Sequence, residues 1–208
     1  MPICHHEIIG KQTEMVIWEI NETEFELEKG LHLSVEALQR LSQRKSEVHR
    51  KGYLAVRQSL KSLGVLPGIY QYDKIGAPFL TDGRFISISH SKDKAAVVIS
   101  STPVGIDLEH YKHKIKLIAS RFLHSSESER SVEMDELVYL TQIWTAKEAL
   151  YKLYKKPGLI FSKQICIKPF KKVSTSGKGL VIEKDKTSEY ILYFRRFESY
   201  YLTLATTI

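Results

Sequence analysis

Residues 104–109 read Val104-Gly105-Ile106-Asp107-Leu108-Glu109, a short apolar run that carries two acidic residues two positions apart. Side chains on a β-strand alternate between its two faces, so Asp107 and Glu109 share one face. Ile106 and Leu108 point to the other face, toward a core. The pattern predicts a strand that presents paired carboxylates on one side and apolar packing on the other.

The segments before and after this strand alternate between helical and strand-like patterns. Apolar spacing predicts a helix over 34–63 with Ser34 as its N-cap, a short helix over 117–123 and a long helix over 135–155. Polar residues fill 125–131, and 171–178 reads as a Gly/Ser/Lys loop. β-rich runs predict further strands over 14–20, 69–72, 85–89, 95–100, 165–167, 179–182, 190–194 and 200–205. The order predicts an α+β fold of two similar subdomains, residues 1–102 and 103–208, each with a helix packed on an antiparallel sheet.

The composition is that of an ordinary globular chain with an uneven basic charge. The 208 residues include 43% hydrophobic and 26% charged residues, with a formal net charge of +7. Residues 1–110 contain 13 Lys and Arg against 14 Asp and Glu, whereas residues 111–208 contain 18 against 10. The basic second half favours an anionic partner, which leaves nucleic acid, headgroups, a phosphorylated ligand or an acidic protein open.

Cysteine usage and hydropathy indicate a cytoplasmic protein. Cys4 and Cys166 stand far apart and form no CxxC motif, so no disulfide framework is expected. The first residues lack the basic and apolar regions of a signal peptide, and no apolar run approaches the roughly 20 residues of a membrane span.

The acidic pair on the predicted strand suggests a metal site. Two neighbouring carboxylates repel each other, and Mg²⁺ is bound by one or two carboxylates together with phosphate oxygens and water. On the long helix, Glu148 and Lys152 are four residues apart and share a face. Glu148 is a candidate third metal ligand or general base, and Lys152 is a candidate phosphate contact. The alternatives are solvated acids on an edge strand and a surface salt pair.

The stretch Ile86-Ser87-Ile88-Ser89-His90-Ser91 ends a predicted strand in polar residues. His90 and the neighbouring hydroxyls are candidate donors to a phosphate. The alternative is a structural histidine whose hydrogen bonds are satisfied within the fold.

The Ser89-His90-Ser91 strand end, the GIDLE strand and the helix WTAKEALYK (144–152) together resemble the 4′-phosphopantetheinyl transferase superfamily. The three motifs agree with that family in order and spacing. Weaker similarity covers HRKGYLAVRQSLK (49–61) and ASRFL (119–123). The length resembles the monomeric, pseudo-dimeric type that activates secondary-metabolite synthetases such as surfactin synthetase. The resemblance implies two subdomains related by pseudo-twofold symmetry, with an active site at their interface.

The resemblance also implies roles for individual residues. Asp107, Glu109 and Glu148 match the family's magnesium ligands, and Lys147 and Lys152 match lysines that contact coenzyme A phosphates. Ser89 and His90 match residues near the 3′-phosphate, while either Arg57 or Lys61 supplies a helix cation for the nucleotide. Where the family often has Gly-Lys-Pro, this chain has Gly76-Ala77-Pro78, with Lys74 nearby.

The implied reaction is the Mg²⁺-dependent transfer of phosphopantetheine from coenzyme A to a serine of an acidic apo acyl or peptidyl carrier protein, with release of 3′,5′-ADP. Whether Glu148 acts as base, metal ligand or both stays open. Three rival interpretations remain: a nucleic-acid-binding module, another metal-dependent phosphoryl-transfer enzyme such as a nuclease, and a coenzyme A binder without catalysis. Paired carboxylates and the absence of a nucleic-acid-binding signature argue against the first.

Overall fold

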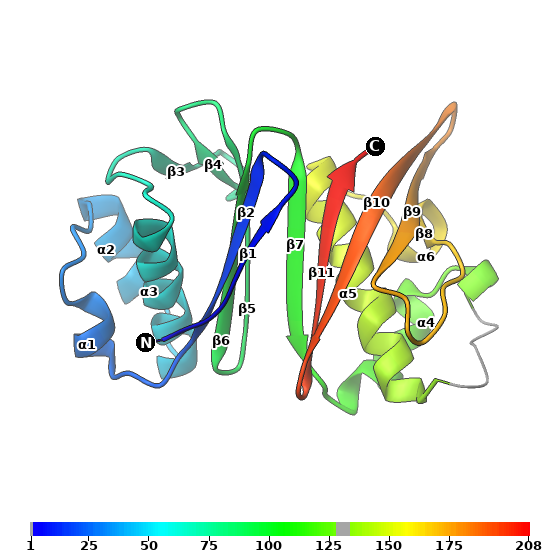
Figure 1. The fold of residues 1–208 in the computed structure, drawn as a ribbon, viewed down its shortest axis with the longest axis horizontal. Helices are drawn as coiled ribbons and strands as arrows, with labels where there is room; N and C mark the ends of the chain where they lie inside the picture. The colour runs from blue at the N-terminus through cyan, green and yellow to red at the C-terminus, as the bar shows by residue number, and fades with distance from the viewer. Residues whose placement is uncertain (1, 128–133) are drawn as a thin grey trace. The chain divides into compact units, whose positions relative to one another are not determined.

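The computed structural model describes residues 2–127 and 134–208. The chain divides into two compact units, Met1–Thr102 and Pro103–Ile208. Each unit packs helices on an antiparallel sheet (Figure 1), which confirms the predicted α+β class. The two units are described separately below.

Unit 1 is built on a four-stranded antiparallel sheet in the order β1-β2-β6-β5. The strands are β1 (Ile3–Ile9), β2 (Thr13–Glu19), β5 (Phe85–Ser91) and β6 (Lys94–Ser100). Helix α3 (Glu47–Ser62) packs on this sheet, and its Leu54 and Ala55 join Val97 and Ile99 in a buried core. Two short helices, α1 (Glu24–Glu28) and α2 (Val35–Ser42), and the hairpin of β3 (Tyr70–Tyr72) and β4 (Pro78–Leu80) complete the unit.

The helix predicted over 34–63 is two helices, so that prediction is wrong in its extent. Ser34 does cap α2, because its Oγ accepts a hydrogen bond from Ala37 N at 3.2 Å. The chain then leaves the helix after Ser42 and re-enters at Glu47 with Ser46 in an extended cap conformation. Serines and charged residues at 42–46 provide no apolar contacts that would hold one continuous helix. Strands β1 and β4 and helix α1 were not predicted, since each is short or only half-buried.

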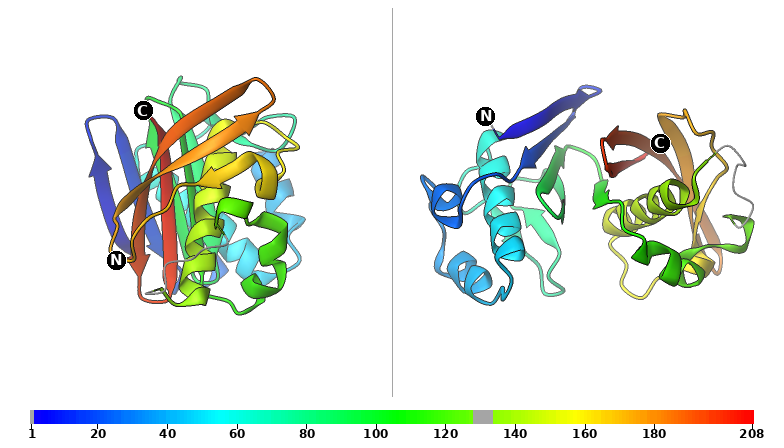
Figure 2. Two further views of the ribbon diagram at one scale, coloured as in Figure 1. Left: turned by 90° about the vertical axis from the view of Figure 1, so that its right-hand side faces the viewer. Right: turned by 90° about the horizontal axis from the view of Figure 1, so that it is seen from below.

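Unit 2 contains a five-stranded antiparallel sheet in the order β7-β11-β10-β9-β8. Its strands are β7 (Val104–His110), β8 (Ile165–Ile167), β9 (Ser176–Glu183), β10 (Lys186–Phe197) and β11 (Tyr200–Thr207). The long helix α5 (Glu136–Tyr154) lies against this sheet (Figure 2), and α4 (Lys114–Phe122), the 3₁₀ helix η1 (Ser125–Glu127) and α6 (Phe161–Gln164) are the other helical segments.

The ends of α5 agree with the sequence signals. Asp135 is the N-cap, and its carboxylate accepts hydrogen bonds from Leu137 N and Val138 N. Lys155 adopts a left-handed conformation with φ of 55°, two residues before Pro157, and this closes the helix. The predicted loop over 171–178 is wrong at its end, because β9 already begins at Ser176 and pairs with β10. Of the polar stretch 125–131, residues 128–131 lie outside the described residues.

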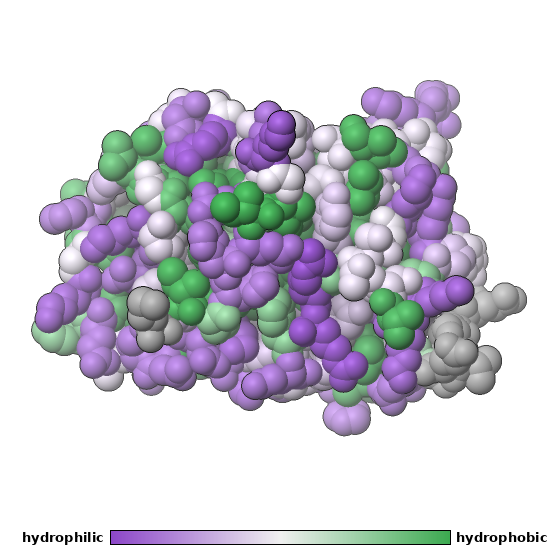
Figure 3. All heavy atoms as spheres, viewed as in Figure 1, coloured by the Kyte–Doolittle hydropathy of each residue, from purple (hydrophilic) through white to green (hydrophobic). Residues whose placement is uncertain are grey.

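The molecular surface is predominantly polar on the face drawn in Figure 3, where hydrophobic residues occur in small separate groups. Within residues 2–127 and 134–208, none of the helices is both long enough and apolar enough to cross a membrane. Cys4 and Cys166 are both free thiols.

Candidate functional site

A glycine sets the distance between β7 and α5. A Cβ atom built on Gly105 would lie 1.9 Å from the carbonyl oxygen of Ala149 and 2.8 Å from the amide nitrogen of Leu153. No larger residue fits there without moving one backbone away from the other. Because Gly105, Asp107 and Glu109 share one face of the strand, this contact also turns both carboxylates toward α5.

Asp107 meets the helix through Lys152. Lys152 Nζ lies 2.7 Å from Asp107 Oδ1 and donates a second hydrogen bond to the carbonyl oxygen of Ile106 at 3.1 Å. The carboxylate is 4% exposed, so its charge lies away from bulk water. The structure thus brings together two of the predicted site residues, one from the strand and one from the helix.

Glu148 joins the same group of charges. The pKa of its carboxyl is raised to about 7, first by burial and then by the nearby carboxylates of Asp107 and Glu109, while Lys152 acts in the opposite direction. Glu109 is half-exposed and lies 3.8 Å from Lys112. The three predicted carboxylates and one predicted lysine therefore form a coupled acidic cluster in unit 2.

The side chains of this acidic cluster do not surround a single point. Across the described parts of the chain, no three His, Cys, Asp or Glu side chains stand in an arrangement that would hold one metal ion. The ammonium of Lys152 pairs with Asp107 within this cluster. The oxygen donors suit a hard divalent cation in number and type, but binding one requires these side chains to turn and Lys152 to give up part of its contact with Asp107.

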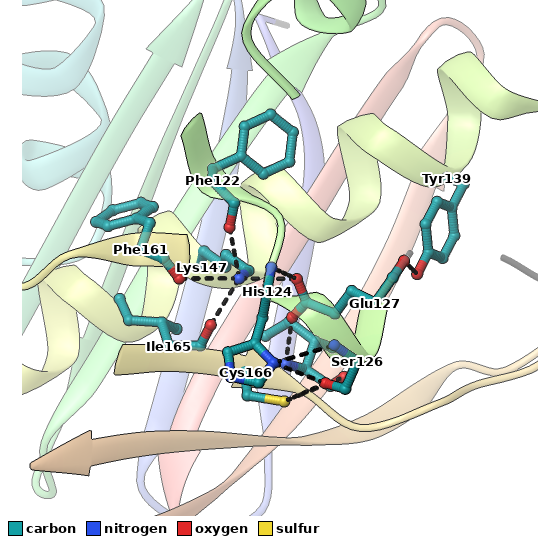
Figure 4. A network of polar contacts seen from close by, with 10 residues as sticks. Phe122, His124, Ser126, Glu127, Tyr139, Lys147, Phe161, Ile165 and Cys166 are labelled. Carbon is teal, nitrogen blue, oxygen red and sulfur yellow. Dashed lines mark hydrogen bonds and ion pairs between the residues drawn. The ribbon is translucent and has the colours of Figure 1, made fainter. Parts of the chain in front are cut away.

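Lys147 has a different environment from the one expected. Its side chain is fully buried, and its ammonium donates to the carbonyl oxygens of three residues and forms an ion pair with Glu127 Oε2 at 2.8 Å. The three carbonyls belong to Phe122 (2.7 Å), Phe161 (3.1 Å) and Ile165 (2.6 Å), and they converge on the lysine in Figure 4. These contacts give Lys147 a structural role in unit 2, and its expected contact with coenzyme A phosphates stays a prediction.

Glu127 completes this buried network and was not singled out from the sequence. Its Oε1 accepts from Ile167 N and its Oε2 from His124 N, both at 2.7 Å. Its backbone oxygen accepts from the hydroxyl of Tyr139, whose pKa is raised to about 12 by burial and by the Glu127 charge. Burial lowers the pKa of Lys147, and the Glu127 carboxylate partly offsets that effect. A signal was present, because Lys147 falls on the apolar stripe of Ile143, Ala146 and Leu150.

His90 and Ser89 end β5 beside the start of α3. A Cβ atom on Gly52 would come within 2.5 Å of the His90 ring, and the rings of His49 and His90 lie 5.9 Å apart at nearly right angles. Ser89 is buried and His90 is exposed. His49 was not predicted as a site residue, although it belongs to the stretch that resembles the family's N-terminal helix.

Arg57 and Lys61 lie on another face of α3. Five residues separate Gly52 from Arg57, which is about 140° around a helix and about 7.5 Å along it. Arg57 is 8% exposed and Lys61 donates from Nζ to the carbonyl oxygen of Gly30 at 2.9 Å. The structure therefore does not group these two cations with His90. Lys74 is exposed in the turn between β3 and β4, the same turn in which Asp73 Oδ1 accepts from Ala77 N.

The fold and the acidic cluster describe an α+β protein in which carboxylates and a lysine meet between a strand and a helix, as in many enzymes that act on phosphates. Residues 103–205 match the profile of the 4′-phosphopantetheinyl transferase superfamily. The chain belongs to this superfamily. The matched region holds the acidic cluster and Lys147 but not His90, Arg57 or Lys61.

Curated relatives point the same way. The chain is 28% identical over 111 residues to the 4′-phosphopantetheinyl transferase gsp of Aneurinibacillus migulanus, covering 50% of this chain and 47% of the relative. It is 33% identical over 117 residues to the enterobactin synthase component D of Salmonella typhi, covering 53% and 48%. It is 32% identical over 96 residues to a 4′-phosphopantetheinyl transferase of Bacillus subtilis, covering 45% and 42%. The chain thus spans about half the length of the curated relatives it matches.

Proposed function

We propose that this protein transfers 4′-phosphopantetheine from coenzyme A to a serine of an apo acyl or peptidyl carrier protein in the cytoplasm. The observation that carries the proposal is the acidic cluster of Asp107, Glu109 and Glu148 with Lys152, which lies inside the region that matches the superfamily. In the reaction the serine oxygen forms a bond to the β-phosphorus of coenzyme A. The bond from that phosphorus to the bridging oxygen breaks, and 3′,5′-ADP leaves.

The carboxylates are proposed to hold Mg²⁺. Burial and, after it, the neighbouring carboxylates raise the pKa of Glu148, and a divalent cation bound among the carboxylates would relieve their mutual repulsion. A bound Mg²⁺ neutralises charge on the pyrophosphate oxygens. The ion pair between Lys152 and Asp107 competes with that cation, so we propose that Lys152 moves from Asp107 to a phosphate oxygen when coenzyme A binds.

Glu148 is also the candidate base for the serine proton. Its pKa of about 7 is suited to accepting a proton near neutral pH. Direct ligation of the metal and acceptance of the proton stay alternative roles for this side chain. Lys152 adds positive charge where negative charge develops on the leaving group.

For the nucleotide end of coenzyme A, Ser89 and His90 are the proposed contacts, with His49 beside them. The exposed His90 ring offers a donor to a phosphate. Lys61 and Arg57 stay candidates by family resemblance alone, because they face away from His90 on α3. The expectation that both units contribute to one active site, and that the protein is a monomer, stays a prediction.

The test is intact-mass spectrometry of apo carrier proteins incubated with the enzyme, coenzyme A and Mg²⁺. We expect a mass gain of one phosphopantetheine arm that is abolished by EDTA and by Glu148→Gln. Glu136→Gln is the matched control, because Glu136 lies on the same helix and pairs with the surface residue Lys116. If coenzyme A binds tightly but no carrier of several unrelated types gains mass, the protein is a coenzyme A binder without this activity and the proposal fails.

A further inference from the structure

Unit 1 contains a hollow of about 890 Å³. None of the proposed catalytic residues of unit 2 lines it. It lies between α2, α3 and the β3–β4 hairpin. Aliphatic side chains make up much of its wall. The polar lining includes three tyrosines (Tyr53, Tyr70 and Tyr72), three cations (Arg40, Arg57 and Lys61) and the carboxylate of Glu36. Concave sites with an apolar wall and a few convergent polar groups are the usual form of small-molecule sites.

The guanidinium of Arg57 is caged by tyrosines. It lies 3.8 Å from the ring centre of Tyr53, 4.4 Å from that of Tyr70 and 5.7 Å from that of Tyr72. Its Nη2 donates to the hydroxyls of Tyr53 at 2.6 Å and Tyr72 at 3.4 Å. The cage orients the charged group rigidly and keeps water from most of it, since Arg57 is 8% exposed.

This buried cation has no anion beside it. Arg57 forms no ion pair with any Asp or Glu in the described residues, and its Nη1 has no hydrogen-bond partner there either. Burying an unpaired charge destabilises a fold, and so does leaving a buried donor without an acceptor. A cation held in this way beside a hollow is accounted for if a ligand supplies the missing negative charge.

The other charges of the hollow are largely paired. Arg40 Nε lies 3.0 Å from Glu36 Oε1, and its guanidinium stacks on Tyr72 at 4.0 Å. Lys61 is exposed, so water solvates its ammonium, which also donates to the neutral carbonyl oxygen of Gly30. Among the described residues, the Arg57 guanidinium is therefore the one buried cation of the hollow that remains to be neutralised, and a singly charged carboxylate supplies that charge. Leu33, Leu60 and Val65 supply an apolar wall for the rest of such a ligand.

We propose that this hollow is a binding site for a small organic acid, with its carboxylate on Arg57 and its aromatic or aliphatic body against the apolar wall. This proposal replaces the nucleotide role that family resemblance gives to Arg57, because the proposed nucleotide contacts Ser89 and His90 adjoin a different face of α3. The inference does not depend on the proposed transferase activity, and its test needs no turnover.

The probes are 4-fluorophenylacetate and 4-fluorophenyl phosphate, followed by ¹⁹F NMR with the full chain. We expect the carboxylate to bind more tightly than the phosphate and Arg57→Met to weaken its binding by about tenfold or more. Arg44→Met is the matched control, because Arg44 stacks on the same Tyr53 ring at 4.1 Å but does not line the hollow. We expect it to change affinity less than twofold.

Two further measurements keep the test decisive. If Arg57→Met does not fold, as judged by circular dichroism, Leu60→Ala at the apolar wall is expected to lower affinity for the carboxylate probe while folding. Saturating coenzyme A is expected to leave the probe bound. The proposal is overturned if the carboxylate probe does not bind the wild type, or if its affinity is unchanged in both folded variants. It is also overturned if coenzyme A displaces the probe, because the hollow would then be a nucleotide subsite.

Discussion

Replacing Lys147 by methionine is expected to damage stability and to spare recognition of coenzyme A. The ammonium of Lys147 holds three backbone carbonyls and the Glu127 carboxylate, all without exposure to solvent. Removing one partner of a buried ion pair costs about 3–5 kcal/mol, because the remaining charge is left uncompensated. For a chain of this size each kcal/mol lowers the Tm by about 2–4 °C, so the Tm should fall by roughly 6–20 °C.

The assay is thermal unfolding followed by circular dichroism, with steady-state kinetics at a temperature where the variant stays folded. Lys156→Met is the matched control, since Lys156 forms an exposed ion pair with Glu183 and such pairs contribute little. Its Tm should not change measurably. The KM of Lys147→Met for coenzyme A should stay within about twofold of the wild type, because no lost contact reaches the ligand.

A double-mutant cycle separates the ion pair from the carbonyl contacts. Lys147→Met combined with Glu127→Gln should recover part of the lost stability, because neither buried charge is then left alone. A wild-type Tm for Lys147→Met would refute the structural role. A folded Lys147→Met variant with unchanged Tm and a tenfold higher KM for coenzyme A would also refute it, because Lys147 would then contact the substrate.

Two further substitutions test close contacts of glycine residues, and one change of salt concentration tests the charge distribution of the chain. Gly105→Ala should destabilise the fold by several kcal/mol and lower activity in whatever fraction stays folded, because a Cβ atom meets the Ala149 backbone oxygen at 1.9 Å; an unchanged Tm would contradict the close approach. Gly52→Ala should raise the KM for coenzyme A with a smaller change in Tm, because the flexible His90 ring yields instead of backbone; equal KM values would argue against a nucleotide contact at His90. Raising the salt concentration should raise the KM for an acidic carrier more than the KM for coenzyme A, because the second half of the chain carries the excess of basic residues. If neither KM changes with salt, the carrier is not steered electrostatically.

The sequence predicted those parts of the fold that local signals determine. The α5 helix has a capping aspartate, a long apolar stripe and a terminal Pro-Gly, and its ends were placed within one residue. The helix over 34–63 was misjudged because the break at 43–46 depends on tertiary packing of α2 and α3 and not on a proline or glycine. Strand β1 is half-exposed along its length, so its pattern lacks the apolar run that marks a buried strand.

The acidic cluster was predictable because alternation on a strand is strict. Once residues 104–109 are a strand, Asp107 and Glu109 must share a face, and the remaining question is only which helix lies opposite. The environment of Lys147 was harder to predict from the sequence, because it depends on Glu127, 20 residues earlier, and on three carbonyl groups from separate segments. Sequence spacing carries no information about which carbonyls will converge on a buried charge.

The two lysines of the WTAKEALYK helix lie in different environments, one buried and one partly exposed, and helix geometry explains why. Lys147 and Lys152 are five residues apart, which turns them about 140° away from each other. Lys147 points into the core of unit 2, where its ammonium binds carbonyl oxygens of α4, α6 and β8 and so holds these elements to α5. The other points to β7, where it pairs with Asp107 of the candidate metal site. The buried lysine fixes the helix that carries Glu148, and the partly exposed one is the lysine that we propose moves from Asp107 to a phosphate oxygen.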